Sequence, residues 1–366
     1  MSITDSVFIQ LLSLGLGNDV EFDIPLEEVD WPAVVQHAMT QGLDAVAFDG
    51  LQALYERRPE LTEALDASLG ETKFDWLGLT LQAEQDYEAY RGKLRDLASF
   101  YGQEGFKMLV LKGYGLSLDY PVPAHRPTGD IDVYLYGRGE EADERVKEKL
   151  GVVVKQNEDK HSTFQFQGLS VENHATFLNV VEHRCRRAIE TALEVEAENA
   201  LVVSLEGVEI YVPTPMMNAL FLPCHMASHF VFGGIPMKQL VDWAVFLERY
   251  GKDVPWTHVR LLAEGAGCFK LVRALNGIVM DHLGVPSECV PDWGRDQALE
   301  DRIWQDCLKP RKDLAARSVW EKLKDYLAAR WKFRLAYRES MFLNFFRHGW
   351  ASIRGKYLPG SRSVWE

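Results

Sequence analysis

The sequence has little cysteine and no long apolar run. Its five cysteines are scattered, none forms a CxxC pair, and their number is odd, which argues against a disulfide framework and indicates reduced thiols. No apolar stretch reaches the roughly 18 residues that span a bilayer, and the first residues lack the basic charge that opens a signal peptide. We therefore expect a cytoplasmic protein without a transmembrane segment.

Positive charge is also scarce over most of the chain. The formal net charge is −14 at pH 7, which argues against a protein that wraps long nucleic acid. Residues 309–366 are the exception, because fourteen Lys or Arg and five Asp or Glu give them about +9. This tail is also rich in aromatics, a composition that favours an amphipathic helix packed on the body of the protein. A surface for RNA, lipid headgroups or a partner stays open as the alternative.

The remaining composition is that of an ordinary globular protein, with 366 residues, 47% hydrophobic and 26% charged. Periodicity and turn residues predict helices over 74–104, 138–150, 215–232 and 236–250, strands over 106–111, 130–136, 162–166 and 169–177, and a hairpin over 201–212. Asp30 is an expected N-cap, with Pro32 early in the helix that follows.

This order of elements predicts an α+β fold with a small mixed sheet, flanked by helical regions at both ends of the chain. We expect four parts: a helical N-terminal region over 1–104, an α/β core over 105–212, a helical region over 213–300 that completes an active-site cleft, and basic, aromatic-rich helices over 301–366.

Two aspartates at the start of a predicted strand are the most informative feature. Asp130 and Asp132 are two residues apart, so both project from the same face, with Cα atoms roughly 6.5–7 Å apart. Ile131 and Val133 point the other way, into the core. Two carboxylates on one face can hold one Mg²⁺ or bridge two, as in phosphoryl-transfer enzymes. The alternative is an exposed strand start with solvated acids.

A third carboxylate is expected on a neighbouring strand. Glu172, in Val171-Glu172-Asn173-His174, is the best candidate, and His174 faces the same side two residues further on. The alternative is that Glu172 is an ordinary polar strand residue. Magnesium, with manganese as the alternative, is the expected ion, because it is bound by carboxylates together with substrate phosphates.

These residues resemble a known protein family. Lys112-Gly113, Tyr120-Pro121, Arg126 and Gly129-Asp130-Ile131-Asp132 are similar to the LKG…YP…R…DID pattern of an uncharacterised bacterial nucleotidyltransferase family, within the DNA polymerase β-like nucleotidyltransferase superfamily. The acid-histidine segment at 172–174 and the stretch containing His225, His229, Lys238 and Asp242 also fit, so the resemblance covers roughly residues 25–250.

The resemblance implies a nucleotidyltransferase fold and a nucleoside triphosphate (NTP) substrate. It implies metal-binding and catalytic roles for Asp130, Asp132 and Glu172. It also implies a set of nucleotide-binding residues: Lys112, Gly113, Arg126, Gly129, Lys238 and Asp242.

Each nucleotide-binding candidate has a simpler alternative. Lys112 and Arg126 are expected to contact phosphates. Neutralising the charge of the nearby acids explains these two residues equally well. Gly113 is explained by a turn with positive φ. Lys238 and Asp242, four residues apart on a predicted helix, fit an ordinary ion pair equally well.

A histidine pair lies on the same stretch. His225 and His229, also four residues apart on a predicted helix, favour packing or substrate contact over a zinc site, because no third ligand is evident.

The expected activity is therefore metal-dependent transfer of a nucleoside monophosphate from an NTP, such as ATP, to a hydroxyl. The acidity of the chain favours a small molecule or a protein over nucleic acid as acceptor, although the basic tail keeps tRNA open. A nucleotide-binding module without catalysis and a metal-dependent phosphohydrolase are the alternatives.

Overall fold

The computed structural model describes residues 1–157, 161–309, 324, 327–342 and 344. The helices are α1 (Ile3–Gly15), α2 (Trp31–Gln41), α3 (Asp44–Arg57), α4 (Thr62–Leu69), α5 (Thr72–Gln103), α6 (Tyr114–Ser117), α7 (Gly139–Leu150), α8 (Arg187–Glu198), α9 (Pro215–Phe232), α10 (Met237–Tyr250), α11 (Trp256–Ala266), α12 (Phe269–Leu283), α13 (Gln297–Cys307) and α15 (Arg330–Ala336). Short 3-10 helices are η1 (Leu26–Glu28), η2 (Pro59–Leu61), η3 (Pro123–His125), η4 (Arg184–Arg186) and η5 (Ser287–Cys289).

The strands of the described residues form one seven-stranded mixed sheet in the order β3-β4-β5-β2-β1-β7-β6. They are β1 (Leu109–Val110), β2 (Ile131–Tyr134), β3 (Lys155–Asn157), β4 (His161–Phe166), β5 (Leu169–His174), β6 (Leu201–Leu205) and β7 (Val208–Val212). β2 pairs parallel with β5, and β1 pairs parallel with β7 and antiparallel with β2. The mixed α+β class expected from the sequence is confirmed.

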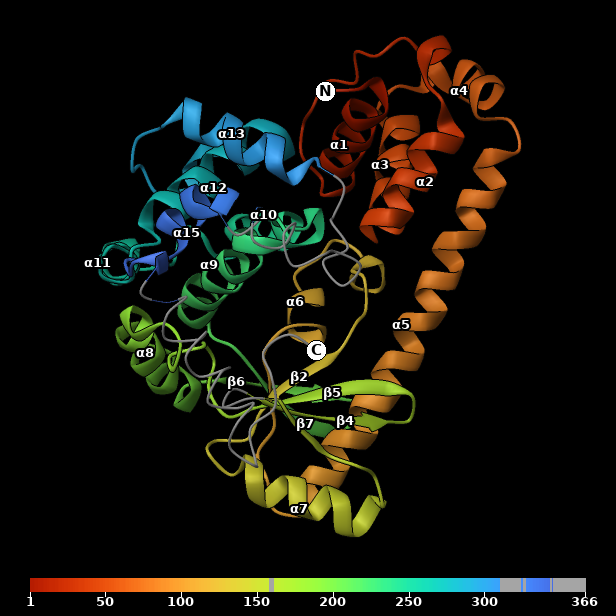
Figure 1. The fold of residues 1–366 in the computed structure, drawn as a ribbon. Coiled ribbons are helices and arrows are strands. Elements are labelled where there is room, and N and C mark those ends of the chain that lie inside the picture. Colours follow the sequence, from red (N-terminus) through yellow and green to blue (C-terminus); the bar gives the residue numbers. More distant parts are fainter. Residues whose placement is uncertain (158–160, 310–323, 325–326, 343, 345–366) are drawn as a thin grey trace.

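The N-terminal helices pack closely and are joined to the sheet by one long helix (Figure 1). Asp30 caps α2 by accepting from the backbone N–H of Ala33 at 3.1 Å, as expected. α1 and α3 cross so closely that a Cβ on Gly50 would lie 1.8 Å from the carbonyl oxygen of Leu11. α5 continues unbroken for 32 residues, and its second half reaches the sheet (Figure 1).

The sheet separates a core face from a polar face. Ile131 and Val133 of β2 and Val171 of β5 are buried in a cluster with residues of α5 and α7, and these helices lie beside and below the sheet in Figure 1. The alternate residues Asp132 and Glu172 project from the opposite face, because side chains alternate along a strand. α9 and α10 lie on that side of the sheet (Figure 1).

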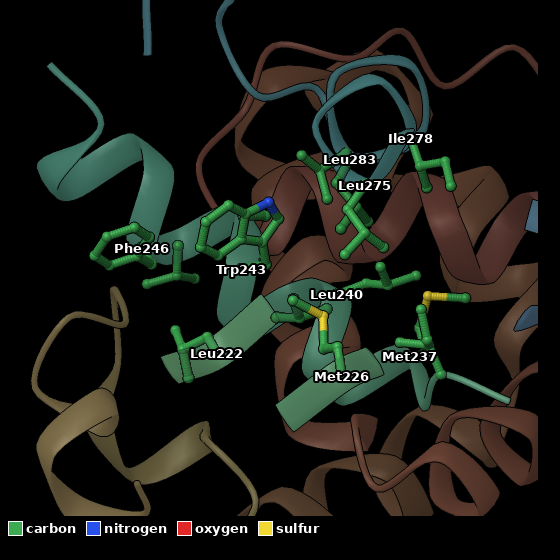
Figure 2. Packing of buried hydrophobic residues seen from close by; sticks show 14 of the residues in the cluster. Leu222, Met226, Met237, Leu240, Trp243, Phe246, Leu275, Ile278 and Leu283 are labelled. Carbon is green, nitrogen blue, oxygen red and sulfur yellow. The ribbon is translucent and has the colours of Figure 1, made fainter. Parts of the chain in front are cut away.

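A second cluster of buried hydrophobic residues fixes the positions of the helices that cover the polar face. Figure 2 shows Leu222 and Met226 of α9, Leu240 and Trp243 of α10, and Leu275 of α12 packed together. All five are buried. The Trp243 indole N–H also donates to the Asn276 side chain at 3.0 Å. α10 is thereby fixed between α9 and α12.

The two helices at the polar face begin where the sequence predicts. Thr214 caps α9, where its hydroxyl accepts from the Met217 N–H at 3.0 Å, and Pro236 precedes α10. β1 is shorter than the strand expected over 106–111, β3 was not expected, and β5 ends at His174 rather than at 177.

Part of the basic tail is described. Phe333 of α15 is buried against the body of the protein, and Trp331 packs at the edge of the same core, whereas Phe342 is exposed. The packed-helix prediction therefore holds for α15. The tail aromatics outside the described residues are Trp320, Tyr326, Phe345, Phe346, Trp350, Tyr357 and Trp365.

All five cysteines lie within the described residues and are free thiols, in agreement with the sequence analysis. No described helix is both long enough and apolar enough to cross a membrane.

Candidate active site

The central feature of the polar face is a pair of carboxylates on adjacent parallel strands. Asp132 of β2 lies directly opposite Glu172 of β5 in the strand register. Asp132 is buried, with 7% of its surface exposed, and Glu172 is half-buried. The solvated strand start considered as an alternative is therefore wrong for Asp132. The strand pairing brings together two acids that are forty residues apart in the chain.

His174 lies between these two carboxylates. Its Nε2 atom is 3.1 Å from Oδ1 of Asp132 and 3.7 Å from Oε2 of Glu172. Ligand atoms of the three residues all lie within 4.8 Å of one another, close enough to share a metal ion. His161 of β4 stacks on His174 with ring centroids 5.5 Å apart, and its Nε2 atom is 4.0 Å from Glu172.

Lys112 contacts the other oxygen of Asp132. The ammonium Nζ lies 3.0 Å from Oδ2 of Asp132 and 3.4 Å from Nε2 of His225 on α9. His225 in turn lies 3.2 Å from His229 through their Nε2 atoms. Lys112 therefore neutralises Asp132 in this structure, one of the two alternatives expected for it, and connects the sheet to the histidine pair on α9.

Asp130 lies immediately before β2 and is exposed. Burial of part of the carboxyl group, followed by the negative charges of Glu172 and Asp132, raises the pKa of Asp130, while the positive charges of Lys112 and Lys238 act against this rise. Both lysines therefore act electrostatically on the acidic cluster, and Lys238 does so from the first turn of α10.

The pKa values of the two strand carboxylates are shifted in the other direction. Burial acts to raise the pKa of Asp132, but the hydrogen bond from His174 and the charge of Lys112 outweigh it and hold the pKa well below its usual range. The hydrogen bond from His174 is also the main cause of a lowered pKa for Glu172. Both groups are therefore carboxylates at neutral pH, which is the form that binds cations.

Arg126 and Asp242 form a buried ion pair beside this cluster. The guanidinium donates from Nε to Oδ1 of Asp242 at 2.8 Å and from Nη2 to Oδ2 at 3.0 Å. The Tyr120 hydroxyl also donates to Oδ1 at 2.7 Å. Arg126 is thus fixed by α10, and it neutralises Asp242 rather than Asp130 or Asp132.

The two glycines expected at the site have different surroundings. Gly113 has φ of 60°, and a Cβ added there would lie 2.5 Å from the Tyr90 hydroxyl. It therefore meets both conditions that require glycine, a left-handed backbone and close approach of a side chain. Gly129 is exposed, and nothing lies within 4 Å of an added Cβ.

The donor set fits a divalent cation. Two ionised carboxylates and one imidazole converge, and the Nε2 atom of His174 faces both acids. Oxygen donors suit Mg²⁺ and Mn²⁺, whereas an imidazole is more typical of Zn²⁺, Cu²⁺, Fe²⁺ and Ni²⁺. Asp132, Glu172 and His174 are the residues that would hold such an ion, with Asp130 beside them.

Comparison with known proteins agrees with this geometry. Residues 27–283 match the family described as uncharacterised nucleotidyltransferase. The chain belongs to this family. No curated protein matches the chain significantly.

A solved structure, that of an antigenic nucleotidyltransferase-like protein from Paracoccidioides brasiliensis, is 10% identical, with a TM-score of 0.34 over 53% of this chain and 92% of that one.

The structure places three residues at or beside the site of this nucleotidyltransferase family member to which the sequence assigned no role. The sequence placed His174 on the face of Glu172 and within the acid-histidine segment of the family pattern, but gave it no role, because its contact with Asp132 depends on the β2–β5 register. Tyr120 and His161 had no assigned role. The Tyr120-Pro121 motif was the signal for the first of these, whereas a lone histidine on a hairpin gives none.

Proposed function

We propose that this protein is a divalent-cation-dependent nucleotidyltransferase that transfers a nucleoside monophosphate from an NTP to a hydroxyl of a small molecule or a protein. The observation that carries the proposal is the register of Asp132 with Glu172 on adjacent parallel strands, with His174 between them. Membership of residues 27–283 in a nucleotidyltransferase family supports an NTP as substrate.

We assign the cation to Asp132, Glu172 and His174, with Asp130 as a further ligand, and we propose Mg²⁺ or Mn²⁺ as the ion. Bound there, it would polarise the phosphates and lower the pKa of the acceptor hydroxyl. Like-charged carboxylates this close are costly without a counter-charge, and Lys112 supplies one at 3.0 Å from Asp132.

The basic residues are assigned to the phosphates. Lys112 and Lys238 both act electrostatically on Asp130, so a triphosphate beside Asp130 lies within their field. Arg126, held by Asp242, supplies a fixed guanidinium charge. These charges stabilise the negative charge that develops during transfer.

The reaction balances with an acceptor and an NTP alone. The acceptor oxygen bonds to the α-phosphorus, the bond from that phosphorus to the bridging oxygen breaks, and pyrophosphate leaves with its electron pair. The hydroxyl proton is taken up by Glu172 and passed to solvent. The formal net charge of −14 favours a small molecule or a protein over nucleic acid as acceptor, and the free cysteines agree with a cytoplasmic location.

The test is pyrophosphate release with each NTP, Mg²⁺ or Mn²⁺, and a panel of acceptors. The double variant Asp130→Asn and Asp132→Asn should lose release while keeping its circular dichroism spectrum. The matched control changes Glu144 and Glu148 to Gln, because these exposed acids lie on α7, on the opposite face of the sheet. It should keep the wild-type rate.

Three outcomes separate the alternatives. Unchanged release in the double Asn variant eliminates the mechanism. NTP binding by calorimetry without turnover on any acceptor supports a nucleotide-binding module. Release of orthophosphate without an acceptor supports a metal-dependent phosphohydrolase.

A further inference from the structure

The loop over residues 118–130 connects α6 to β2 and delivers two residues to the site, Arg126 and Asp130. On one side the loop is held by α10, through the hydrogen bonds from Tyr120 and Arg126 to Asp242. On the other side it meets the N-terminal helices. There the imidazole of His125 makes hydrogen bonds to α3 and α5.

His125 is placed between two carboxylates from different helices. It is buried, with 7% of its surface exposed. Its Nδ1 atom lies 2.7 Å from Oδ2 of Asp49 on α3, and its Nε2 atom lies 3.2 Å from Oε1 of Glu84 on α5. A neutral imidazole has one N–H and one acceptor nitrogen, so only the protonated ring donates to both acids.

We propose that His125 is a positioning residue for the nucleotidyl transfer described above: its imidazolium clamps the loop over residues 118–130 to α3 and α5. The clamp keeps the neighbouring Arg126 aligned with Asp242 and keeps Asp130 at the start of β2. The inference rests on the proposed function for its catalytic consequence, whereas the clamp itself rests on the contacts of His125 with Asp49 and Glu84.

The charges around His125 agree with this role. Burial opposes protonation, but the hydrogen bonds and charges of Asp49 and Glu84 outweigh it, so the pKa of His125 is raised above its ordinary value. Asp44 of α3 also interacts electrostatically with His125. α6 also packs on η3, and its titratable side chain is the phenol of Tyr114.

The direction of the pH dependence follows from this raised pKa. The stabilisation from the clamp is complete below the pKa of histidine in the unfolded chain and is lost as the pH rises through the higher folded-state pKa. Above that pH one ring nitrogen becomes an acceptor facing a carboxylate, so one of the two contacts is lost. The loop should therefore be held at neutral and lower pH and released at alkaline pH.

The experiment compares His125→Gln with His37→Gln in the full chain. His37 is the matched control, because its partners Asp5, at 3.7 Å, and Phe8 both belong to α1 rather than to the loop. Hydrogen exchange of residues 118–130, corrected for intrinsic rates, is followed from about pH 6 to pH 9, together with kcat and KM for the NTP.

In the wild-type protein we expect the hydrogen-exchange protection of residues 118–130 to fall as the pH rises and His125 loses its proton. In His125→Gln we expect this protection to be low at every pH. KM for the NTP should rise about tenfold in this variant, because the loss of one hydrogen bond to a charged group weakens binding by about this factor. The change in kcat should be smaller. Adding Glu84→Gln to His125→Gln should partly restore protection, because it removes a carboxylate left without a donor. His37→Gln should match the wild type.

Two results would overturn the inference. The first is a His125→Gln variant whose loop protection and KM equal those of the wild type. The second is a wild-type protein whose loop protection does not change with pH. The second needs no variant, so it applies even if His125→Gln fails to fold. Absence of NTP turnover in the wild-type protein counts against the proposed function alone, because loop exchange still reports the clamp.

Discussion

The buried pair of Arg126 and Asp242 gives a quantitative test of how the site is held in place. Arg126 is 10% exposed and Asp242 is 11% exposed, and two hydrogen bonds join them. Asp242→Asn leaves the guanidinium buried without its counter-charge. Removing one partner of a buried ion pair costs about 3–5 kcal/mol, so we expect a loss of about 3 kcal/mol, because the amide still accepts one hydrogen bond.

The pair should also show strong coupling in a double-mutant cycle. Arg126→Met together with Asp242→Leu removes both charges, and apolar replacement of a buried pair is often close to neutral. The double variant should therefore be more stable than either single variant, with a coupling free energy of about 2 kcal/mol or more. Arg145 and Glu148 on α7 are the exposed control pair, for which we expect about 0.5 kcal/mol or less.

The assay is urea unfolding followed by far-ultraviolet circular dichroism, with midpoints compared at equal m-value. Calorimetric titration with an NTP provides a second measurement, because Asp242→Asn should also weaken nucleotide binding through Arg126. Additive single-variant costs, each below about 0.5 kcal/mol, would refute the conclusion that this pair fixes the loop to α10.

Two further predictions concern the backbone and the acids of the site. Gly113→Ala should destabilise the protein by about 1–3 kcal/mol, because it places a Cβ against Tyr90 at a positive φ. In the same urea assay Gly92→Ala, in open space on α5, should stabilise it by about 0.5–1 kcal/mol; equal effects would contradict this reasoning. Because burial and Glu172 raise the pKa of Asp130, Mn²⁺ affinity should fall between about pH 7 and pH 5 more steeply in the wild type than in Asp130→Asn. Parallel titration curves would count against this role of Asp130.

Much of the fold was predictable because its signals are local. Thr214 before Pro215 and Pro236 before Met237 mark the starts of α9 and α10 within a residue of the expected positions. The hairpin of β6 and β7 was also expected, since Glu206-Gly207 forms a turn with positive φ at both residues. Capping and turn geometry act over a few residues and can be read from the sequence.

The pairing of distant strands was not predictable. β7 adds to the sheet beside β1 through Leu109 and Tyr211, residues about a hundred positions apart. β3 is built from Lys155, Gln156 and Asn157, which carry no apolar alternation. Parallel pairs and polar edge strands are selected by the whole sheet, so the local sequence does not specify them.

The same limit applies to the partners of the charged residues. Asp242 is four residues from Lys238 on α10, which made a pair between them a natural expectation, yet its oxygens accept hydrogen bonds from Tyr120 and Arg126. His125, adjacent to a motif arginine, carried no signal of its own. The aspartate pair was recognisable because the two-residue spacing on a strand fixes a common face, whereas the contact of Asp132 with Glu172 required the register.

The most direct test of the cation site is the binding of Mn²⁺, followed by the electron paramagnetic resonance signal of the free ion. We expect a bound ion in the wild-type protein and in the control Glu144→Gln. In Asp132→Asn and Glu172→Gln the affinity should be at least about tenfold weaker, because each substitution removes a charged ligand. Equal Mn²⁺ binding by all four proteins would show that the carboxylates of β2 and β5 do not hold the ion.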